Sequence, residues 1–181
     1  IEELNHGKPL PCLEAHITET PYKSYLVVLP GNFLTTVYAE YGARLLEQNV
    51  RVFLQARGEV NKGLIETARE EPEMFFAYNN GLTAIASDIE IIKSDDGSTS
   101  IRKIKDLQIV NGGQTTAALL YAKDREHTDL KNVFVQMKLS VIDPDEIEEI
   151  VPNISKFANT QNKVLSSDLF SSHPFNNVFE K

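Results

Sequence analysis

The segment 106–121 constrains the fold of this chain more than any other. Ile109 and Val110 favour a pleated strand. The sequence Asn111-Gly112-Gly113 then predicts a tight turn, because glycine adopts positive φ without steric cost. The residues from Gln114 onward are good helix formers with few breakers. We therefore expect a strand, a glycine turn and a helix in direct succession.

The start of the helix predicted at Gln114 is a candidate anion site. The first turn of a helix leaves backbone N–H groups unpaired at the positive end of the helix dipole. The two preceding glycines would let a phosphate or carboxylate approach the backbone closely. Plain chain reversal explains the same residues and stays open. The segment lacks the Gly-x-Gly-x-x-Gly spacing of dinucleotide-binding folds. A Walker-type site is not expected either, because no lysine follows the glycines.

Composition places the chain among ordinary globular proteins. Its 181 residues are 41% hydrophobic and 24% charged, which suits one domain, alone or with a small extension. There is no run of about 18 apolar residues, so no membrane span is predicted. The net charge of −8 argues against a protein that coats DNA nonspecifically, since such proteins are usually basic.

Cysteine and histidine usage argues against two kinds of site. The single cysteine, Cys12, rules out an internal disulfide framework and is compatible with a reducing cytoplasm. No metal-ligand spacing relates the histidines, which are His6, His16, His127 and His173. No N-terminal segment resembles a signal peptide, so we expect a cytoplasmic protein. We also expect neither a metal nor a cofactor. The first residue is Ile1 rather than Met, and the last, Lys181, closely follows the apolar pair Val178-Phe179. We therefore expect a piece of a longer protein.

Hydrophobic periodicity predicts mixed secondary structure. In the first part of the chain we expect a strand at 25–29, a helix from a cap at Asn32 to about Gln48, and a helix from a cap at Asn61 to before Pro72. Two strands, at 74–78 and 82–92, should form a hairpin joined by Asn79-Asn80-Gly81. A turn at 95–98, a strand at 107–110 and a helix at 114–123 should follow. We then expect a strand at 133–142, a helix from Asp143-Pro144 that Pro152 kinks or restarts, a polar break at 159–162 and a last helix capped by Ser166 or Ser167.

These elements do not alternate as regular βαβ units. The sum therefore predicts an α+β fold in which helices pack on a mixed sheet. We expect residues 1–30 to form an N-terminal extension or a strand of a preceding domain, and residues 31–181 to form the domain itself. In the strand at 133–142, Lys138 shares a face with Gln136 and Ser140, which is solvent or a pocket floor. Solvent is the favoured interpretation.

Three clusters rich in asparagine and glutamine follow predicted elements. They are Asn79-Asn80-Gly81, Asn111-Gly112-Gly113-Gln114-Thr115 and Asn159-Thr160-Gln161-Asn162. Neutral amides bind phosphates, riboses, bases and peptide groups by hydrogen bonds. Turn and cap chemistry is the favoured explanation for any one cluster. The occurrence of three favours a shared polar cleft.

Candidate cations lie in one stretch of the chain. They are Arg44, Arg51, Arg57, Lys62 and Arg69. Most should lie on solvated faces, because glutamates are interspersed among them. A phosphate bound to an acidic chain needs at least one nearby cation. Lys62 and Arg51 are the best candidates, and Arg51 is favoured because position 55 is glutamine and offers no helix ion pair.

Acidic residues offer an enzymatic alternative. A run of acids crowds one predicted helix start, namely Asp143, Asp145, Glu146, Glu148 and Glu149. They suit the helix dipole, but their spacing specifies neither a magnesium site nor a two-carboxylate pair. A nuclease or nucleotide hydrolase would draw its acids from Asp88, Asp106 and Asp168. A protein-interaction scaffold without a small ligand is the third alternative.

Five blocks of sequence occur in a characteristic order between residues 38 and 175. They are 41–51, 60–63, 75–83, 109–115 and 158–164. In content and order they resemble the AIPR family, whose name refers to abortive infection and phage resistance in bacteria. The resemblance implies a cytoplasmic defence protein whose partners include other defence-system proteins and no membrane.

A second resemblance concerns the glycine turn. The segment 111–117 is similar in layout to the Asp-Gly-Gln-His-Arg motif of DndB-like proteins and to the Gly-Glu-Arg-Arg turn of ParB-like domains, and 159–169 is similar to a later ParB helix segment. This implies a ParB/sulfiredoxin-like form of the fold and a nucleotide or nucleic-acid phosphate at the helix start. Thr115 and Thr116 stand where arginines would be, which argues against triphosphate hydrolysis and leaves neutral, backbone-led anion binding intact. The candidate ligand-binding residues are Asn79, Asn80, Gly81, Asn111, Gly112, Gly113, Gln114, Thr115, Arg51, Lys62, Asn159, Gln161 and Asn162.

Overall fold

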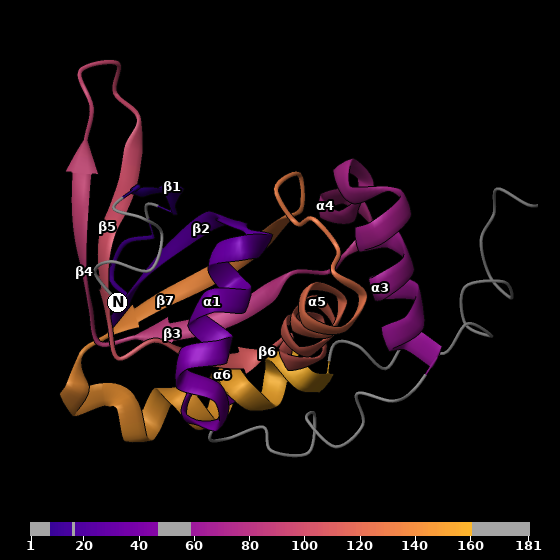
Figure 1. Cartoon of the computed structure of the whole chain (residues 1–181). Helices are drawn as coiled ribbons and strands as arrows, with labels where there is room; N and C mark the ends of the chain where they lie inside the picture. Colours follow the sequence, from indigo (N-terminus) through magenta and orange to yellow (C-terminus); the bar gives the residue numbers. More distant parts are fainter. Residues whose placement is uncertain (1–7, 16, 47–58, 161–181) are drawn as a thin grey trace, which may run out of the picture.

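A seven-stranded mixed sheet organises the computed structural model, which describes residues 8–15, 17–46 and 59–160 (Figure 1). The strands are β1 Leu10–Ala15, β2 Tyr22–Pro30, β3 Leu82–Ala86, β4 Asp88–Lys93, β5 Thr99–Lys105, β6 Gln108–Asn111 and β7 Phe134–Ile142. The helices are α1 Gly31–Tyr41, α3 Glu59–Glu70, α4 Phe75–Tyr78, α5 Gly113–Glu126 and α6 Ile147–Thr160, with 3₁₀ turns η1 Gly42–Leu46, η2 Pro72–Met74 and η3 Pro144–Glu146. The predicted α+β class is confirmed.

The strand order in the sheet is β4-β5-β1-β2-β7-β3-β6. β2 and β7 form the centre and pair antiparallel along their whole length, from Tyr22 opposite Ile142 to Pro30 opposite Phe134. β3 pairs with β7 in parallel, and β6 completes that edge antiparallel to β3. β1 lies between β2 and β5, so two central strands come from the first thirty residues.

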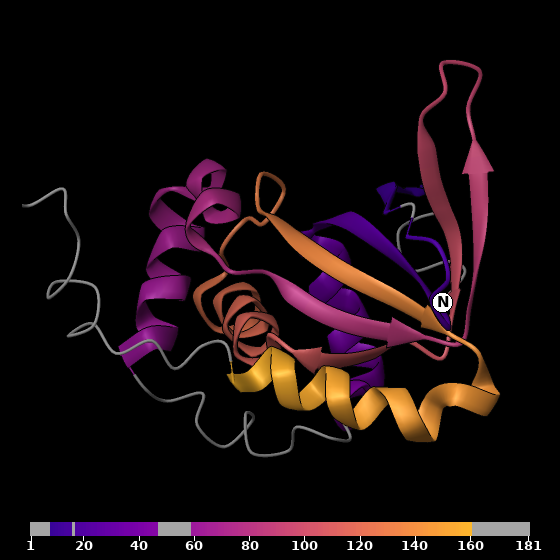
Figure 2. The ribbon, with the colours of Figure 1, turned by 180° about the vertical axis from the view of Figure 1, so that it is seen from behind.

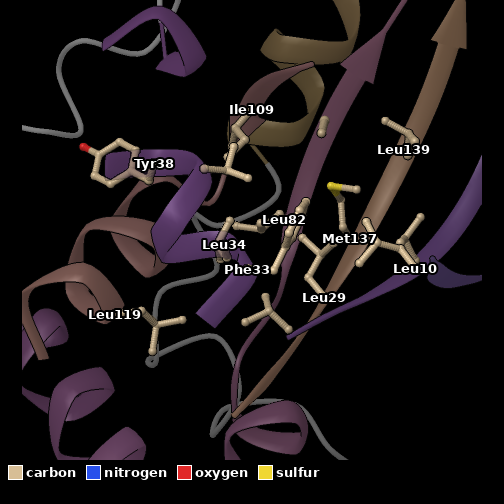
Figure 3. Close-up of a cluster of buried hydrophobic side chains, with 14 of the residues drawn as sticks. Leu10, Leu29, Phe33, Leu34, Tyr38, Leu82, Ile109, Leu119, Met137 and Leu139 are labelled. Atoms are coloured by element: carbon tan, nitrogen blue, oxygen red, sulfur yellow. The ribbon is translucent and has the colours of Figure 1, made fainter. Parts of the chain in front are cut away.

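One face of the sheet carries the main hydrophobic core. Along β7 the side chains alternate as predicted, with Val135, Met137 and Leu139 buried and Gln136 and Lys138 exposed. The buried row packs against α1 and α5, and Figure 3 shows the cluster that these elements form. Each fully buried aliphatic side chain contributes roughly 1.5–3 kcal/mol to folding, so this face supplies most of the stability.

Helix α6 crosses the opposite face of the sheet (Figure 2). Its apolar residues recur at three and four, and Val151 packs with Ile85, Val110 and Ile142 in a second, smaller core. The acids of the first turns lie where the helix dipole favours them, as predicted. The predicted restart at Pro152 is wrong, because α6 runs through this proline to Thr160. The expected break at 159–162 is wrong at its first two residues, which are still helical.

The largest error of the sequence-based prediction concerns residues 74–78. They are helical rather than extended, because Pro72 occupies the first position of η2 and α4 follows directly. Consequently Asn80-Gly81 connects α4 to β3 and closes no hairpin. The predicted strand at 82–92 divides into β3 and β4.

Other boundaries differ from the predictions by smaller amounts. Helix α1 starts at Gly31, and its N-cap is Pro30 rather than Asn32. It ends at Tyr41, and the next residue, Gly42, is its C-cap with a φ of 47°. Helix α3 begins before Asn61 and ends before Pro72, so only its predicted end is confirmed. The turn at 95–98 is confirmed as the tip of the β4–β5 hairpin, which projects from the sheet (Figure 1). The last helix, predicted after Ser166 or Ser167, lies outside the described residues.

Candidate functional site

The predicted strand–turn–helix unit is present as β6, Gly112 and α5. Gly112 is the N-cap of α5 and has a φ of 95°, which confirms that one of the two glycines takes positive φ. The carbonyl of Gly112 accepts a hydrogen bond from the Thr116 amide at 3.2 Å. The first-turn amides that we expected to be unpaired therefore do not include that of Thr116. Helix geometry leaves Gly113, Gln114 and Thr115 as the amides without an intrahelical acceptor.

The turn at Gly112 lies directly against the turn at Gly81. A Cβ on Gly112 would lie 2.4 Å from Leu82 Cδ2 and 2.8 Å from the carbonyl oxygen of Gly81. Gly81 also has positive φ, and a Cβ there would lie 2.4 Å from Cγ of Gln136. Both glycines are therefore required by close packing as well as by backbone conformation.

The side chain of Asn79 links the first two polar clusters. Its Nδ2 donates to Thr115 Oγ1 at 3.0 Å, and its Oδ1 accepts from the amide of Gly81 at 2.8 Å. Asn79 and Thr115 are both buried. These two side chains therefore hold α4, β3 and the start of α5 together.

The third cluster begins beside the other two. Asn111 Nδ2 donates to the carbonyl of Ala158, the residue that precedes Asn159 in the last turns of α6. We call Asn79–Gly81, Asn111–Thr115 and Ala158 the polar junction. The Asn159 side chain and all of Gln161 and Asn162 lie outside the described residues. The cleft shared by all three clusters therefore stays a prediction.

Two side chains of the polar junction are not engaged in holding it together. Asn80 is exposed, although its carbonyl accepts from Gln136 Nε2 at 3.4 Å, and Gln114 is half-buried. Among the described residues the Asn80 and Gln114 side chains form no such bond, whereas Asn79, Asn111 and Thr115 already bind one another or Ala158.

The candidate cations are less closely placed. Lys62 is exposed on α3, and within the described residues no hydrogen bond or ion pair joins it to the polar junction. Helix α3 packs beside α5, and an ion pair between Arg69 and Glu126 at 2.9 Å joins their C-terminal ends. Arg51, the favoured cation, lies outside the described residues.

Residues 46–181 match a protein-family model described as AIPR protein. The chain belongs to the AIPR family. The matched span contains the whole polar junction, whereas β1, β2 and α1 precede it. No curated protein and no solved structure matches the chain. Membership supports an abortive-infection-type defence domain, in agreement with the five ordered sequence blocks.

The acids proposed for an enzymatic role lie apart from the polar junction of this AIPR chain. Asp88 and Asp106 are exposed beside the β4–β5 hairpin, and Asp106 accepts a hydrogen bond from Ser87 Oγ at 2.6 Å. Asp168 lies outside the described residues. Among the residues that the structure describes, no three His, Cys, Asp or Glu side chains are grouped to hold a metal ion.

Burial, and secondarily Glu14, raises the pKa of Cys12, which keeps it a thiol at neutral pH.

Two hollows of this AIPR chain were not predicted from sequence. Arg44, which we expected on a solvated face, is exposed but lines a cavity of about 390 Å³ with Lys103 and Lys105. A groove of about 400 Å³ lies between α6 and strands β2 and β7, and Lys138 and Ser140 form part of its floor. Solvent was favoured for that face of β7, which holds for the exposed Gln136 and Lys138 but not for Ser140, which is buried. The alternation in β7 is the signal that places both side chains on one face.

No described helix of the AIPR chain has the length and apolar character that crossing a bilayer requires.

Replacing Asn79 by Ala should destabilise the AIPR chain by about 1–3 kcal/mol, because the Gly81 amide and the Thr115 hydroxyl would both lose buried partners. Urea unfolding of the Asn79→Ala, Thr115→Val and double variants would measure the coupling between the two side chains. The neighbouring Asn80→Ala change is the control and should alter the free energy of unfolding by less than about 0.5 kcal/mol, because Asn80 is exposed. Equal losses at both asparagines would contradict the role assigned to Asn79.

Proposed function

We propose that this AIPR chain is an anti-phage defence domain that binds a nucleotide or a nucleic-acid phosphate at the start of α5. The observation that supports this most is the left-handed turn at Gly112 before a helix of fourteen residues. Such a turn leaves three amides at the positive end of a helix dipole, which is a common setting for phosphate. Binding would serve sensing or scaffolding in a cytoplasmic defence system, together with other defence proteins.

The polar junction supports a neutral, backbone-led form of binding. Its side chains are amides and hydroxyls, and the structural bonds of Asn79 and Asn111 would keep the turn in place before a ligand arrives. The amides of Gly113, Gln114 and Thr115 would bind phosphate oxygens, and Asn80, Gln114 and the predicted ligand residues Asn159, Gln161 and Asn162 would bind the remaining polar groups.

A cation is expected to complete the site, because the chain carries a net charge of −8. Arg51→Ala should weaken phosphate-ligand binding by about 1–3 kcal/mol if the guanidinium makes a charge-assisted contact. The loss should shrink as salt rises. Lys62→Ala is the second variant, and exposed Lys93 on β4 supplies a matched control that should leave binding unchanged.

The experiment is a titration of the full-length protein with mononucleotides and short oligonucleotides at two salt concentrations. Binding that Arg51→Ala weakens in a salt-dependent way would support the proposal. A salt-independent loss would mean that Arg51 is structural. Failure of every nucleotide and oligonucleotide to bind would overturn the proposal in favour of a protein-interaction scaffold. Metal-dependent loss of nucleic acid would favour a nuclease.

A further inference from the structure

The groove under α6 contains polar groups that the polar junction does not use. Its floor comes from β2 and β7 and its wall from one face of α6, and its volume is about 400 Å³. Small-molecule sites commonly occupy about 300–1,000 Å³. The groove meets the polar junction at Ala158 and otherwise consists of different residues.

Two serines of low exposure line the floor of the groove. Ser24 and Ser140 are directly opposite each other in the β2–β7 register, and they are 8% and 4% exposed. Neither hydroxyl has a hydrogen-bond partner among the described residues. Neither Ser24 Oγ nor Ser140 Oγ is a fully buried, unpartnered atom, so both hydroxyls are accessible from the groove. A molecule in the groove that accepts hydrogen bonds can therefore bind both groups.

Lys138 adds a positive charge next to the two hydroxyls. It precedes Ser140 by two residues on β7, so both side chains point to the same face of the sheet. It lines the groove and forms no ion pair with a described residue. Opposite residues in a sheet are about 5 Å apart and alternate residues about 7 Å apart. An ammonium and two hydroxyls are thus close enough to bind the oxygens of one phosphate.

The register of the sheet separates this positive end of the groove from the acid on its wall. Lys138 pairs with Thr83, Thr83 pairs with Asn111, and Asn111 binds the carbonyl of Ala158. Lys138 therefore lies toward the Ala158 end of α6. Glu149 also lines the groove, nine residues earlier on the helix, which is about 13 Å along its axis. An anion at Lys138 would thus avoid close repulsion from Glu149.

The wall of the groove offers apolar contact for a ring. Ile150, Ile154 and Phe157 recur at three and four on the face of α6 that lines it, and Phe157 is 59% exposed. The remaining polar groups of the lining are Tyr22, Asn153 and Glu149. They can bind hydroxyl or amine groups at the end away from Lys138.

We propose that this groove binds a small phosphorylated molecule that carries an aromatic ring and has the size of a nucleoside monophosphate. The phosphate binds Lys138, Ser24 and Ser140, and the ring packs against Phe157 and the isoleucines. A free mononucleotide and the phosphorylated end of a nucleic acid present the same chemistry. This site is separate from the start of α5 and does not depend on binding there.

Calorimetric titration of the full-length protein with AMP tests the proposal, with adenosine and inorganic phosphate as partial ligands. We expect AMP to bind more tightly than either, and Lys138→Gln to lower its affinity about tenfold or more. Ser140→Ala should lower the affinity several-fold, and Lys93→Gln, which removes a charge from exposed β4, should leave it unchanged. A Lys138→Gln variant that binds AMP like the parent would overturn the proposal, as would AMP binding no tighter than adenosine.

Two further measurements locate the ligand and its source. Amide chemical-shift changes on AMP addition should centre on residues 24, 138, 140 and 157. Changes confined to 113–115 would overturn the groove proposal and support binding at the start of α5, so the two sites fail independently. If a 5′-phosphorylated dinucleotide binds more tightly than AMP, the ligand is the phosphorylated end of a nucleic acid. If it binds more weakly, the ligand is a free nucleotide. Both results support the phosphate site.

Discussion

Gly112→Ala is expected to destabilise the chain by about 3 kcal/mol or more. A non-glycine residue at a φ of 95° costs about 1–3 kcal/mol in backbone strain. The added Cβ would also lie 2.4 Å from Leu82 Cδ2 and 2.8 Å from the Gly81 carbonyl oxygen. Relieving such overlap in a packed region typically costs a further 1–3 kcal/mol, roughly. Urea or thermal unfolding would measure the loss.

Gly97→Ala is the matched control for this prediction. Gly97 has a similar φ of 83° at the tip of the β4–β5 hairpin, but nothing lies within 4 Å of a Cβ built there. Its replacement should cost only the same backbone term, about 1–3 kcal/mol. The difference between the two variants therefore measures the contact between the Gly112 and Gly81 turns. If both variants lose the same free energy, that contact does not constrain the start of α5.

The parts of the fold that sequence predicted are those specified by neighbouring residues. The turn at Gly112 follows from two adjacent glycines, and the strand β7 follows from apolar–polar alternation over the seven residues from Val135 to Val141. The acids that start α6 indicate a helix start by the same local reasoning. None of these features requires knowledge of what the element packs against.

The errors arise where distant partners decide the structure. Residues 74–78 form an apolar run too short to show a helical period, and their helix is stabilised by burial of Phe75 against the rest of the fold. The bounds of β1 were not predicted, and it pairs both with its neighbour β2 and with the distant β5, from Leu10 opposite Ile101 to Cys12 opposite Thr99.

The same distinction applies to the candidate site. Sequence identified the polar clusters but not the bond from Asn79 to Thr115, because the register of β3 and β6 brings those residues together. The pairing of Ser24 with Ser140 is also a consequence of sheet register and leaves no signal in either segment alone. Residue type indicated which groups carry chemistry, and topology decided which of them meet.

Phe75→Ala should produce the other large loss, about 3–5 kcal/mol of unfolding free energy. Phe75 is completely buried in the main core, so removing its ring leaves a cavity that the surrounding strands can fill only in part. Phe76→Ala is the control on the same helix turn. Phe76 is 41% exposed, so its replacement should cost about 1 kcal/mol or less. Chemical denaturation of the two variants gives the comparison.

The Phe75 prediction also bears on the polar junction, because α4 leads directly into Asn79. A cavity beneath α4 should let this short helix move and weaken the bond by which the Gly81 amide donates to Asn79 Oδ1. Hydrogen exchange at Gly81 should then be faster in Phe75→Ala than in Phe76→Ala, by more than the difference in global stability explains. Unchanged local protection at Gly81 in both variants would show that the polar junction holds its geometry without α4. Faster exchange would show that the core under Phe75 fixes the position of Asn79, and through Thr115 the start of α5.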